Sequence, residues 1–130
     1  MTNEKYLKEV IAACEAFNIP LSIALSLIDQ ESANGTAPDT WKKNSAGAVG
    51  LTQITKSALG DFSENNKVSK AIVEILKNNN VDYTNSRTEN ESAYRDNIWT
   101  GIGNLRLIND RYFDGADSDW SKSLGWYYAG

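Results

Sequence analysis

Glu31 is a carboxylate on the apolar side of a predicted amphipathic helix. At about 100° per residue, helical geometry gives the segment IALSLIDQESANG, residues 23–35, an apolar face and a polar face. Asp29 and Gln30 belong to the polar face, whereas Glu31 falls in the middle of the apolar one, at a position where a leucine would serve folding better. The apolar face consists of Leu21, Ile23, Ala24, Leu25, Leu27 and Ile28.

This position predicts a raised pKa for Glu31. Burial disfavours the charged form of the carboxyl group, and the helix macrodipole also disfavours an anion in the last turn. A carboxylic acid that stays protonated near neutral pH can donate a proton to the leaving oxygen of a glycosidic bond. The helix alone also allows a Glu31 side chain that merely reaches solvent at a frayed helix end.

The composition restricts any catalysis to carboxylates, hydroxyls, amides and lysines. The 130 residues include no histidine and one cysteine, Cys14. This excludes serine–histidine triads, histidine-ligated metals, cysteine clusters and intramolecular disulfides. Cys14 lies among Val10, Ile11 and Phe17 in a predicted helix, so we expect a small buried apolar residue there.

The net charge of −4 argues against nucleic acid or an anionic membrane surface as a partner, because both require a concentrated basic surface. No apolar run reaches transmembrane length, so no membrane insertion is expected. The segment MTNEKYLKEVIAACEAF lacks the basic region and the continuous apolar run of a secretory signal. If the protein works outside a cytoplasm, we expect that other proteins deliver it or that a signal has been removed.

The apolar pattern predicts a mainly α-helical fold with long polar loops and at most a small β element, in a single domain that spans residues 1–130. Gly101 and Gly103 would each cost about 1 kcal/mol in an isolated helix, so they indicate close helix packing. Residues 33–45 are expected to form a loop, and the polar, asparagine-rich residues 78–96 are interpreted as a surface insertion or lid. Helices are expected over residues 3–17, 20–32, 48–59, 67–77, 97–113 and from about 118.

Four blocks of the sequence resemble the soluble lytic transglycosylases, peptidoglycan-cleaving enzymes related in fold to goose-type lysozyme. The blocks are LSLIDQES, NSAGAVGLTQIT, DNIWTGIGNLRLINDRYF and LGWYYAG, and they follow the family's order within residues 19–130. The most specific part is the Glu-Ser pair at a helix end, followed by Gly-Ala-x-Gly-Leu-x-Gln. The resemblance implies a compact lysozyme-like helical fold.

Carried over residue by residue, the resemblance makes Glu31 the catalytic acid and base. Ser32 matches the adjacent serine; we place it at the substrate site and expect local hydrogen bonding at the helix end. Gly50 permits close backbone approach, and the amide of Gln53 can donate to and accept from a saccharide. A structural role remains the alternative for Gln53. Tyr127 matches a tyrosine that lies near the catalytic glutamate, so its hydroxyl could orient Glu31 or a reacting sugar.

The chain departs from the family pattern at three positions. Thr52 replaces the usual methionine before the glutamine, which predicts a polar floor for the sugar groove. Asn44 replaces a serine and would offer the substrate an amide instead of a hydroxyl, and Tyr128 replaces an asparagine. Asn97 matches the asparagine that opens the family's central helix, and we expect it to be structural. Trp41, in the polar loop, is the best candidate for an exposed ring that stacks on a sugar.

Most glycosidases place two carboxyl groups across the scissile bond, and this sequence offers no clear second acid. Asp29, Asp39 and Asp61 are better explained as caps or solvated surface residues. The resemblance implies a mechanism that needs one acid. Glu31 protonates the β-1,4 bond between N-acetylmuramic acid and N-acetylglucosamine while the N-acetyl group assists, and Glu31 then accepts the C6 hydroxyl proton as a 1,6-anhydro ring closes. No metal or organic cofactor is required.

The expected function is a peptidoglycan lytic transglycosylase that acts on the bacterial cell wall. A lysozyme-type hydrolase and a non-catalytic wall-binding or structural virion domain are the alternatives. The acidic charge and the lack of a signal favour delivery by a bacteriophage virion, or by a conjugation or secretion machine, whose proteins would be further partners. The chain is expected to be either the terminal module of a larger protein or a compact variant.

Overall fold

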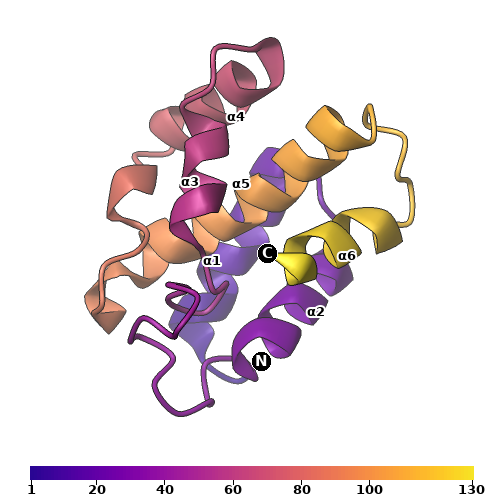
Figure 1. Cartoon of the computed structure of the whole chain (residues 1–130). Coiled ribbons are helices and arrows are strands. Elements are labelled where there is room, and N and C mark those ends of the chain that lie inside the picture. Colours follow the sequence, from indigo (N-terminus) through magenta and orange to yellow (C-terminus); the bar gives the residue numbers. More distant parts are fainter.

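The computed structural model describes residues 1–130 and is mainly helical, as the apolar pattern predicts. Figure 1 shows α5 crossing the middle of the molecule, and α5 contacts α1, α4, α6 and both 3-10 helices. None of the helices combines the length and the apolar character needed to cross a membrane. The elements are α1 (Glu4–Phe17), α2 (Leu21–Ser32), α3 (Lys56–Phe62), α4 (Lys67–Asn78), η1 (Tyr83–Asn85), η2 (Glu91–Ala93), α5 (Tyr94–Tyr112) and α6 (Ser121–Ala129).

Five of the six helices lie within three residues of the bounds predicted from the sequence. Side-chain caps mark two of these starts. The side chain of Asn3 accepts a hydrogen bond from the Tyr6 backbone N–H, and that of Asn66 accepts one from Ser69, whereas α2, α5 and α6 begin without a side-chain cap. Residues 33–45 form turns without a helix, as expected. The apolar period and, for α1 and α4, a side-chain cap therefore locate these helices from the sequence.

The helix predicted over residues 48–59 is wrong in its first half. Val49 and Ile54 form an isolated antiparallel bridge, and α3 begins only at Lys56. Between the bridged residues, Gly50 has φ +87° and Gln53 has φ +50°, which excludes a helix. This short apolar run is buried without a helical period, and periodicity cannot classify such a run. We call residues 50–53 the bridge turn.

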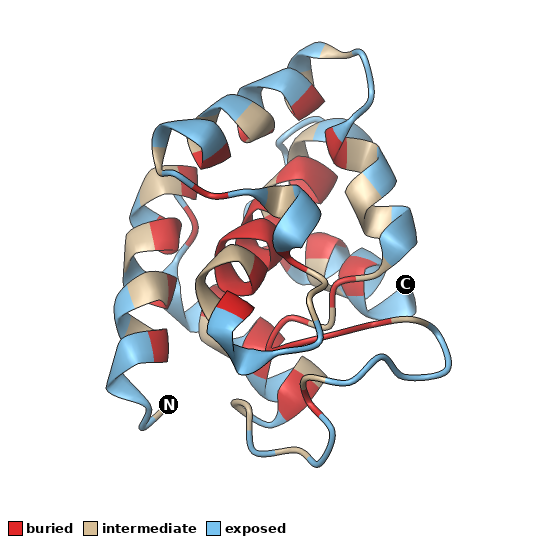
Figure 2. Cartoon of the chain, turned by 90° about the vertical axis from the view of Figure 1, so that its left-hand side faces the viewer, coloured by how far each residue is buried: buried red, intermediate tan, exposed pale blue.

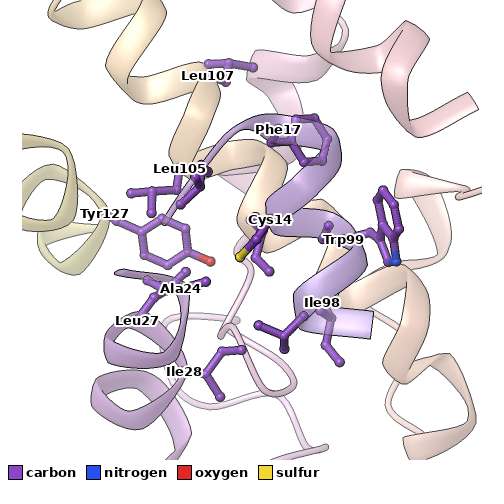
Figure 3. Close-up of a cluster of buried hydrophobic side chains, with 14 of the residues drawn as sticks. Cys14, Phe17, Ala24, Leu27, Ile28, Ile98, Trp99, Leu105, Leu107 and Tyr127 are labelled. Carbon is purple, nitrogen blue, oxygen red and sulfur yellow. The ribbon is translucent and has the colours of Figure 1, made fainter. Parts of the chain in front are cut away.

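The hydrophobic core surrounds α5. Figure 2 shows buried residues in the middle of the molecule and exposed residues on the outer faces of the surrounding helices. Figure 3 shows side chains from α1, α2, α5 and α6 in one cluster, which includes Cys14, Phe17 and Leu105. Cys14 is buried, as predicted, and burial raises its pKa to about 11. The free thiol is therefore protonated at neutral pH and serves packing.

The side chain of Asn97 holds the bridge turn against α5. Its Oδ1 accepts hydrogen bonds from the Thr52 backbone N–H (3.1 Å) and the Thr52 hydroxyl (3.0 Å). Its Nδ2 donates to the carbonyl oxygens of Val49 (2.9 Å) and Ser86 (3.0 Å). Asn97 is fully buried, so each of these bonds satisfies a group that has no access to water. The predicted structural role of Asn97 is confirmed.

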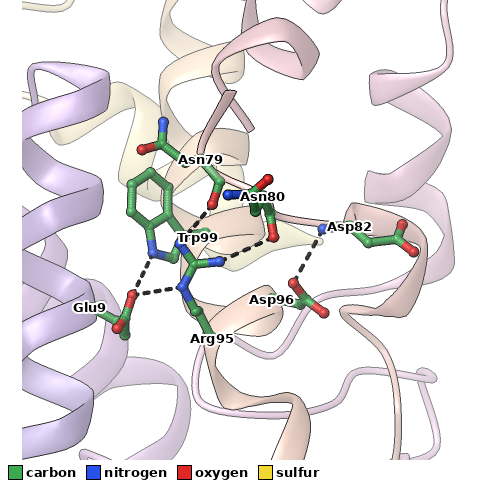
Figure 4. A network of polar contacts seen from close by, with 7 residues as sticks. All are labelled: Glu9, Asn79, Asn80, Asp82, Arg95, Asp96 and Trp99. Carbon is green, nitrogen blue, oxygen red and sulfur yellow. Dashed lines mark hydrogen bonds and ion pairs between the residues drawn. The ribbon is translucent and has the colours of Figure 1, made fainter. Parts of the chain in front are cut away.

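A polar network joins α5 to α1 and to the end of α4 (Figure 4). Arg95 donates to the carbonyl oxygens of Asn79 (2.7 Å) and Asn80 (3.2 Å), just after α4, and to the carboxylate of Glu9 in α1 (3.1 Å). The same carboxylate accepts the indole N–H of Trp99 at 3.0 Å. A cation at a helix C-terminus satisfies carbonyls that lack helical partners. This network ties α1 and the end of α4 to α5.

The polar segment 78–96 packs against α5 instead of forming a lid over a pocket. The segment contains the two 3-10 helices, and Val81, Ser86 and Ala93 are buried. Arg87 reaches out of it to donate to the carbonyl oxygen of Gly47 at 2.8 Å. None of its residues lines either of the two pockets described below. The interpretation of this segment as a lid is therefore wrong for these pockets.

The close approach at Gly101 generates a stability prediction. A Cβ atom at Gly101 would lie 2.3 Å from Cβ of Thr52, so Gly101→Ala should lower the free energy of unfolding by about 1–3 kcal/mol. In α6, a Cβ atom at Gly125 would meet nothing within 4 Å, so Gly125→Ala should raise it by about 0.5–1 kcal/mol. Urea denaturation of both variants measures the difference, and equal effects would contradict the close packing.

Candidate functional site

Glu31 extends the buried stripe of α2. The buried residues of this helix are Ala24, Leu27, Ile28 and Ser32, and the helical period places Glu31 beside them. The carboxyl group of Glu31 is half-buried and forms no hydrogen bond or ion pair with the protein, and burial raises its pKa from 4.5 to about 7. The raised pKa agrees with the expectation from the sequence. The buried face of α2 is narrower than the apolar face expected from the sequence, because Leu21 is 39% exposed.

The end of α2 is shaped by Ser32 and a left-handed turn. The Ser32 hydroxyl donates to the carbonyl oxygen of Ile28 (3.1 Å) and accepts the backbone N–H of Gly35 (3.1 Å). Ala33, Asn34 and Gly35 all have positive φ, so the chain turns sharply after Ser32. The expected local hydrogen bonding of Ser32 is confirmed. The Ser32 hydroxyl therefore both donates and accepts within the protein, although Ser32 also lines the pocket described next.

Glu31 lines a polar pocket of about 370 Å³, which we call the Glu31 pocket. Residues of the 33–45 loop form most of its wall, and the bridge turn contributes Gln53. Two cationic side chains, Lys42 and Lys43, stand at this pocket, with Asp39 at 3.5 Å from the Lys42 ammonium. The lining residues are Glu31, Ser32, Ala37, Pro38, Asp39, Thr40, Lys42, Lys43, Asn44 and Gln53.

Gln53 and Asn44 hold the loops around this pocket together. The Gln53 amide donates to the carbonyl oxygens of Gly50 (2.8 Å) and Thr40 (3.4 Å), and its Oε1 accepts from the Asn44 amide (3.2 Å). Oδ1 of Asn44 accepts the backbone N–H groups of Ala46 and Ala48. Gln53 therefore has a structural role. Both side chains also line the pocket, and their contact with a saccharide stays a prediction.

Tyr127 lies near Glu31, but its hydroxyl is directed to the bridge turn. The buried hydroxyl donates to the Thr52 carbonyl oxygen at 2.6 Å and forms no hydrogen bond with Glu31. Burial raises the pKa of Tyr127, and the charge of Glu31 raises it further. The exposed neighbour Tyr128 has its pKa raised first by desolvation and then by the charges of Glu31 and Asp29. The expectation that Tyr127 orients Glu31 by a hydrogen bond is therefore wrong for the free protein.

Two further expectations about the groove are corrected. Thr52 is fully buried between Asn97 and Gly101 and lines neither pocket, so it does not form a polar groove floor. Trp41 is half-buried against the core, its indole lies beside the Tyr6 hydroxyl, and it does not line the Glu31 pocket. Its expected role as an exposed stacking ring is not supported. Thr52 packs against Asn97 and Trp41 packs near Tyr6, so both side chains contact residues that are distant in the sequence.

A second pocket of about 440 Å³ adjoins the first, and Gln53 lines both. We call it the Asn104 pocket. Asp61, interpreted from the sequence as a cap or surface residue, lies within α3 and lines this pocket, and desolvation followed by the charge of Glu64 raises its pKa. Asn104, Tyr112 and Trp126 also line this pocket, and no motif or spacing in the sequence marks them as pocket residues. The lining residues are Gln53, Ile54, Thr55, Ser57, Ala58, Asp61, Asn104, Ile108, Tyr112, Trp126, Tyr127, Ala129 and Gly130.

No group of three or more cysteine, aspartate or glutamate side chains is placed to hold a metal ion. Comparison with known proteins gave no match to a protein-family model, a curated protein or a solved structure.

The environment of Glu31 predicts how its carboxyl group titrates. A ¹³C NMR titration of the free protein should give a pKa of about 7 for Glu31. Because the folded pKa is raised, the protonated carboxyl favours folding, an advantage that is complete below about pH 4.5 and is lost as the pH rises through about 7.

Glu31→Gln should remove this pH-dependent part of the free energy of unfolding. Glu15→Gln, at an exposed position on α1, provides the matched control and should retain it. A Glu31 pKa at or below 4.5 would show that the carboxyl group is solvated or ion-paired.

The hydrogen bonds of Gln53 generate a separate prediction. Gln53→Ala leaves the Gly50 and Thr40 carbonyls and the Asn44 amide without their partner, so it should lower the free energy of unfolding by about 1–2 kcal/mol. The exposed Asn65→Ala, in the turn before α4, should be near neutral in the same thermal melts. A saccharide-binding loss with unchanged stability would assign Gln53 to binding alone.

Proposed function

We propose that this protein is a peptidoglycan lytic transglycosylase with Glu31 as its catalytic acid and base. The proposal rests on the environment of the Glu31 carboxyl group. The group is half-buried at a pocket and has no hydrogen-bond or ion-pair partner, and burial raises its pKa to about 7. Such a group is protonated in a large fraction of molecules near neutral pH and can give up and recover its proton. The resemblance of the four sequence blocks supports the same reaction.

The two lysines at the Glu31 pocket favour a peptidoglycan strand over a neutral glycan. N-Acetylmuramic acid carries a lactyl group, whose carboxyl end is either charged or attached to a peptide. Lys42 and Lys43 bring ammonium groups to the Glu31 pocket, and both ion pairs that they form, Lys42 with Asp39 at 3.5 Å and Lys43 with Glu89 at 3.8 Å, are solvent-exposed and long. Short-range attraction to these two side chains would seat the acidic part of the strand beside Glu31.

A single carboxyl group is sufficient for the proposed reaction. Protonated Glu31 donates its proton to the β-1,4 glycosidic oxygen, and the bond to C1 of N-acetylmuramic acid breaks as its N-acetyl oxygen attacks C1. The carboxylate of Glu31 then accepts the C6 hydroxyl proton while O6 attacks C1 and displaces the N-acetyl oxygen. The products are a 1,6-anhydromuramyl end and a free 4-hydroxyl, and Glu31 is protonated again. No metal or organic cofactor enters the reaction.

The proposed place of action is the bacterial cell wall. Glycan strands are the proposed partner, and virion or secretion-machine proteins would be the further partners that bring the domain to the wall. The net charge of −4 gives no long-range attraction to an anionic wall, which is consistent with delivery by a larger assembly.

Product analysis tests the proposed reaction. Incubation with purified peptidoglycan should release muropeptides with anhydro ends by mass spectrometry, and Glu31→Gln should reduce the rate by at least about 10³-fold because the proton donor is lost. The rate should fall as the pH rises through about 7. Glu15→Gln should leave the rate unchanged.

The alternatives give different products. Reducing ends instead of anhydro ends would identify a lysozyme-type hydrolase. Absence of cleavage by the folded protein would leave a non-catalytic wall-binding or structural domain, and an unchanged rate for Glu31→Gln would reject the catalytic assignment.

A further inference from the structure

The Asn104 pocket differs from the Glu31 pocket in its charge. Asp61 is the one charged side chain that lines the Asn104 pocket, whereas Lys42 and Lys43 stand at the Glu31 pocket. A single carboxylate on an otherwise uncharged wall favours a ligand that carries a positive charge. The volume of about 440 Å³ lies within the usual range for binding pockets, about 300–1,000 Å³.

The carboxylate of Asp61 has no cationic partner within the protein. It is half-buried, accepts the Tyr112 hydroxyl at a long 3.5 Å and forms no ion pair. The guanidinium of Arg111 lies 3.8 Å from the carboxylate of Glu64, and neither residue lines the pocket. Desolvation and the charge of Glu64 are the two largest influences on the pKa of Asp61, and both raise it. The carboxylate therefore lacks a compensating positive charge.

A stacked pair of aromatic rings forms the wall next to this carboxylate. Tyr112 and Trp126 lie with ring centroids 4.4 Å apart and planes at 18°, and Phe113 meets Trp126 edge-on at 5.9 Å. Trp126 is nevertheless 49% exposed. A tryptophan that is held in place by its neighbours and still open to solvent is typical of the residues that dominate binding between proteins.

The Tyr112 ring sets the spacing between the carboxylate and Trp126. Its hydroxyl lies at Asp61, and its ring lies on Trp126. A ligand that contacts both must carry its positive charge at the end of an apolar stem about as long as one aromatic ring. Arginine and lysine side chains have this form, because about three to four methylene groups separate their charged group from the backbone.

We propose that the Asn104 pocket binds an arginine or lysine side chain of a partner protein, with the charged group at Asp61 and the methylene stem against Tyr112 and Trp126. The net charge of −4 favours the approach of a basic segment to this surface. The docking site does not depend on the proposed reaction, because neither Asp61 nor Trp126 lines the Glu31 pocket. Among the proposed delivery proteins, it selects those with an exposed basic side chain.

Titration with the blocked pentapeptide Gly-Ser-Arg-Ser-Gly tests the proposal by NMR, with the backbone amides of α5 and α6 as reporters. A matched peptide carries citrulline, which is neutral and nearly isosteric, in place of arginine. The arginine peptide should bind with a Kd of about 0.1–10 mM, since a single side chain buries few atoms. The citrulline peptide should bind roughly tenfold more weakly, because it cannot form the charged hydrogen bonds with Asp61.

Asp61→Asn should weaken binding of the arginine peptide roughly tenfold, to the level of the citrulline peptide. This variant should melt no lower than the wild type, because asparagine still accepts the Tyr112 hydroxyl and a desolvated charge is removed. Glu74→Gln is the matched control: it makes the same change in net charge at an exposed position on α4 outside both pockets, and should bind like the wild type. Trp126→Ala should weaken the binding of both peptides.

No binding of the arginine peptide, equal affinity for the two peptides, or wild-type affinity in Asp61→Asn would overturn the assignment. An equal loss in Glu74→Gln would also overturn it, because long-range attraction would then explain the binding. Binding of butylguanidinium without binding of the arginine peptide would reject a partner protein as the occupant. None of these results depends on peptidoglycan cleavage, so the docking site can fail while the proposed reaction stands, and the reverse.

Discussion

The four hydrogen bonds of the Asn97 side chain determine how the loop region meets the helices. They fix Val49, Thr52 and Ser86 to one point of α5, and each joins groups that water cannot reach. A Cβ atom at Gly50 would lie 2.2 Å from Nδ2 of Asn97, so the turn approaches this closely only because Gly50 has no side chain. The position of the bridge turn, and of Gln53 within it, depends on this contact.

The same contact connects the bridge turn with α6. Because Thr52 is held by Asn97, its carbonyl oxygen is available to the Tyr127 hydroxyl, which places α6 near the end of α2. Glu31 is desolvated in this region, and its charge is felt by Tyr127 and Tyr128. The raised pKa of Glu31 is therefore a property of the assembled fold, and it is consistent with a proton donor near neutral pH.

Glu31 and Asn104 each carry a desolvated polar group without a hydrogen-bond partner, and each lines a pocket. Ser32, Asn97 and Asn109 are hydrogen-bonded within the protein, whereas the Glu31 carboxyl group and Oδ1 of Asn104 are not. Both residues line pockets, and the two pockets share Gln53. An unpaired polar group reduces stability, and at the Glu31 pocket a ligand can supply the missing partner.

The sequence by itself determined the mainly helical class, five of the six helices and the burial of Cys14, because capping and amphipathic periodicity act within a few residues. It also located Glu31 and the direction of its pKa shift, since helical geometry alone places that residue on the buried stripe of α2. Only the tertiary structure decided the bridge turn, the internal bonds of Gln53 and the packed position of Trp41. It also revealed the Asn104 pocket, whose walls come from α3, α5, α6 and the bridge turn. The physical reason is sequence separation: Thr52 meets Asn97 across 45 residues and Tyr127 across 75, and no local pattern encodes such contacts.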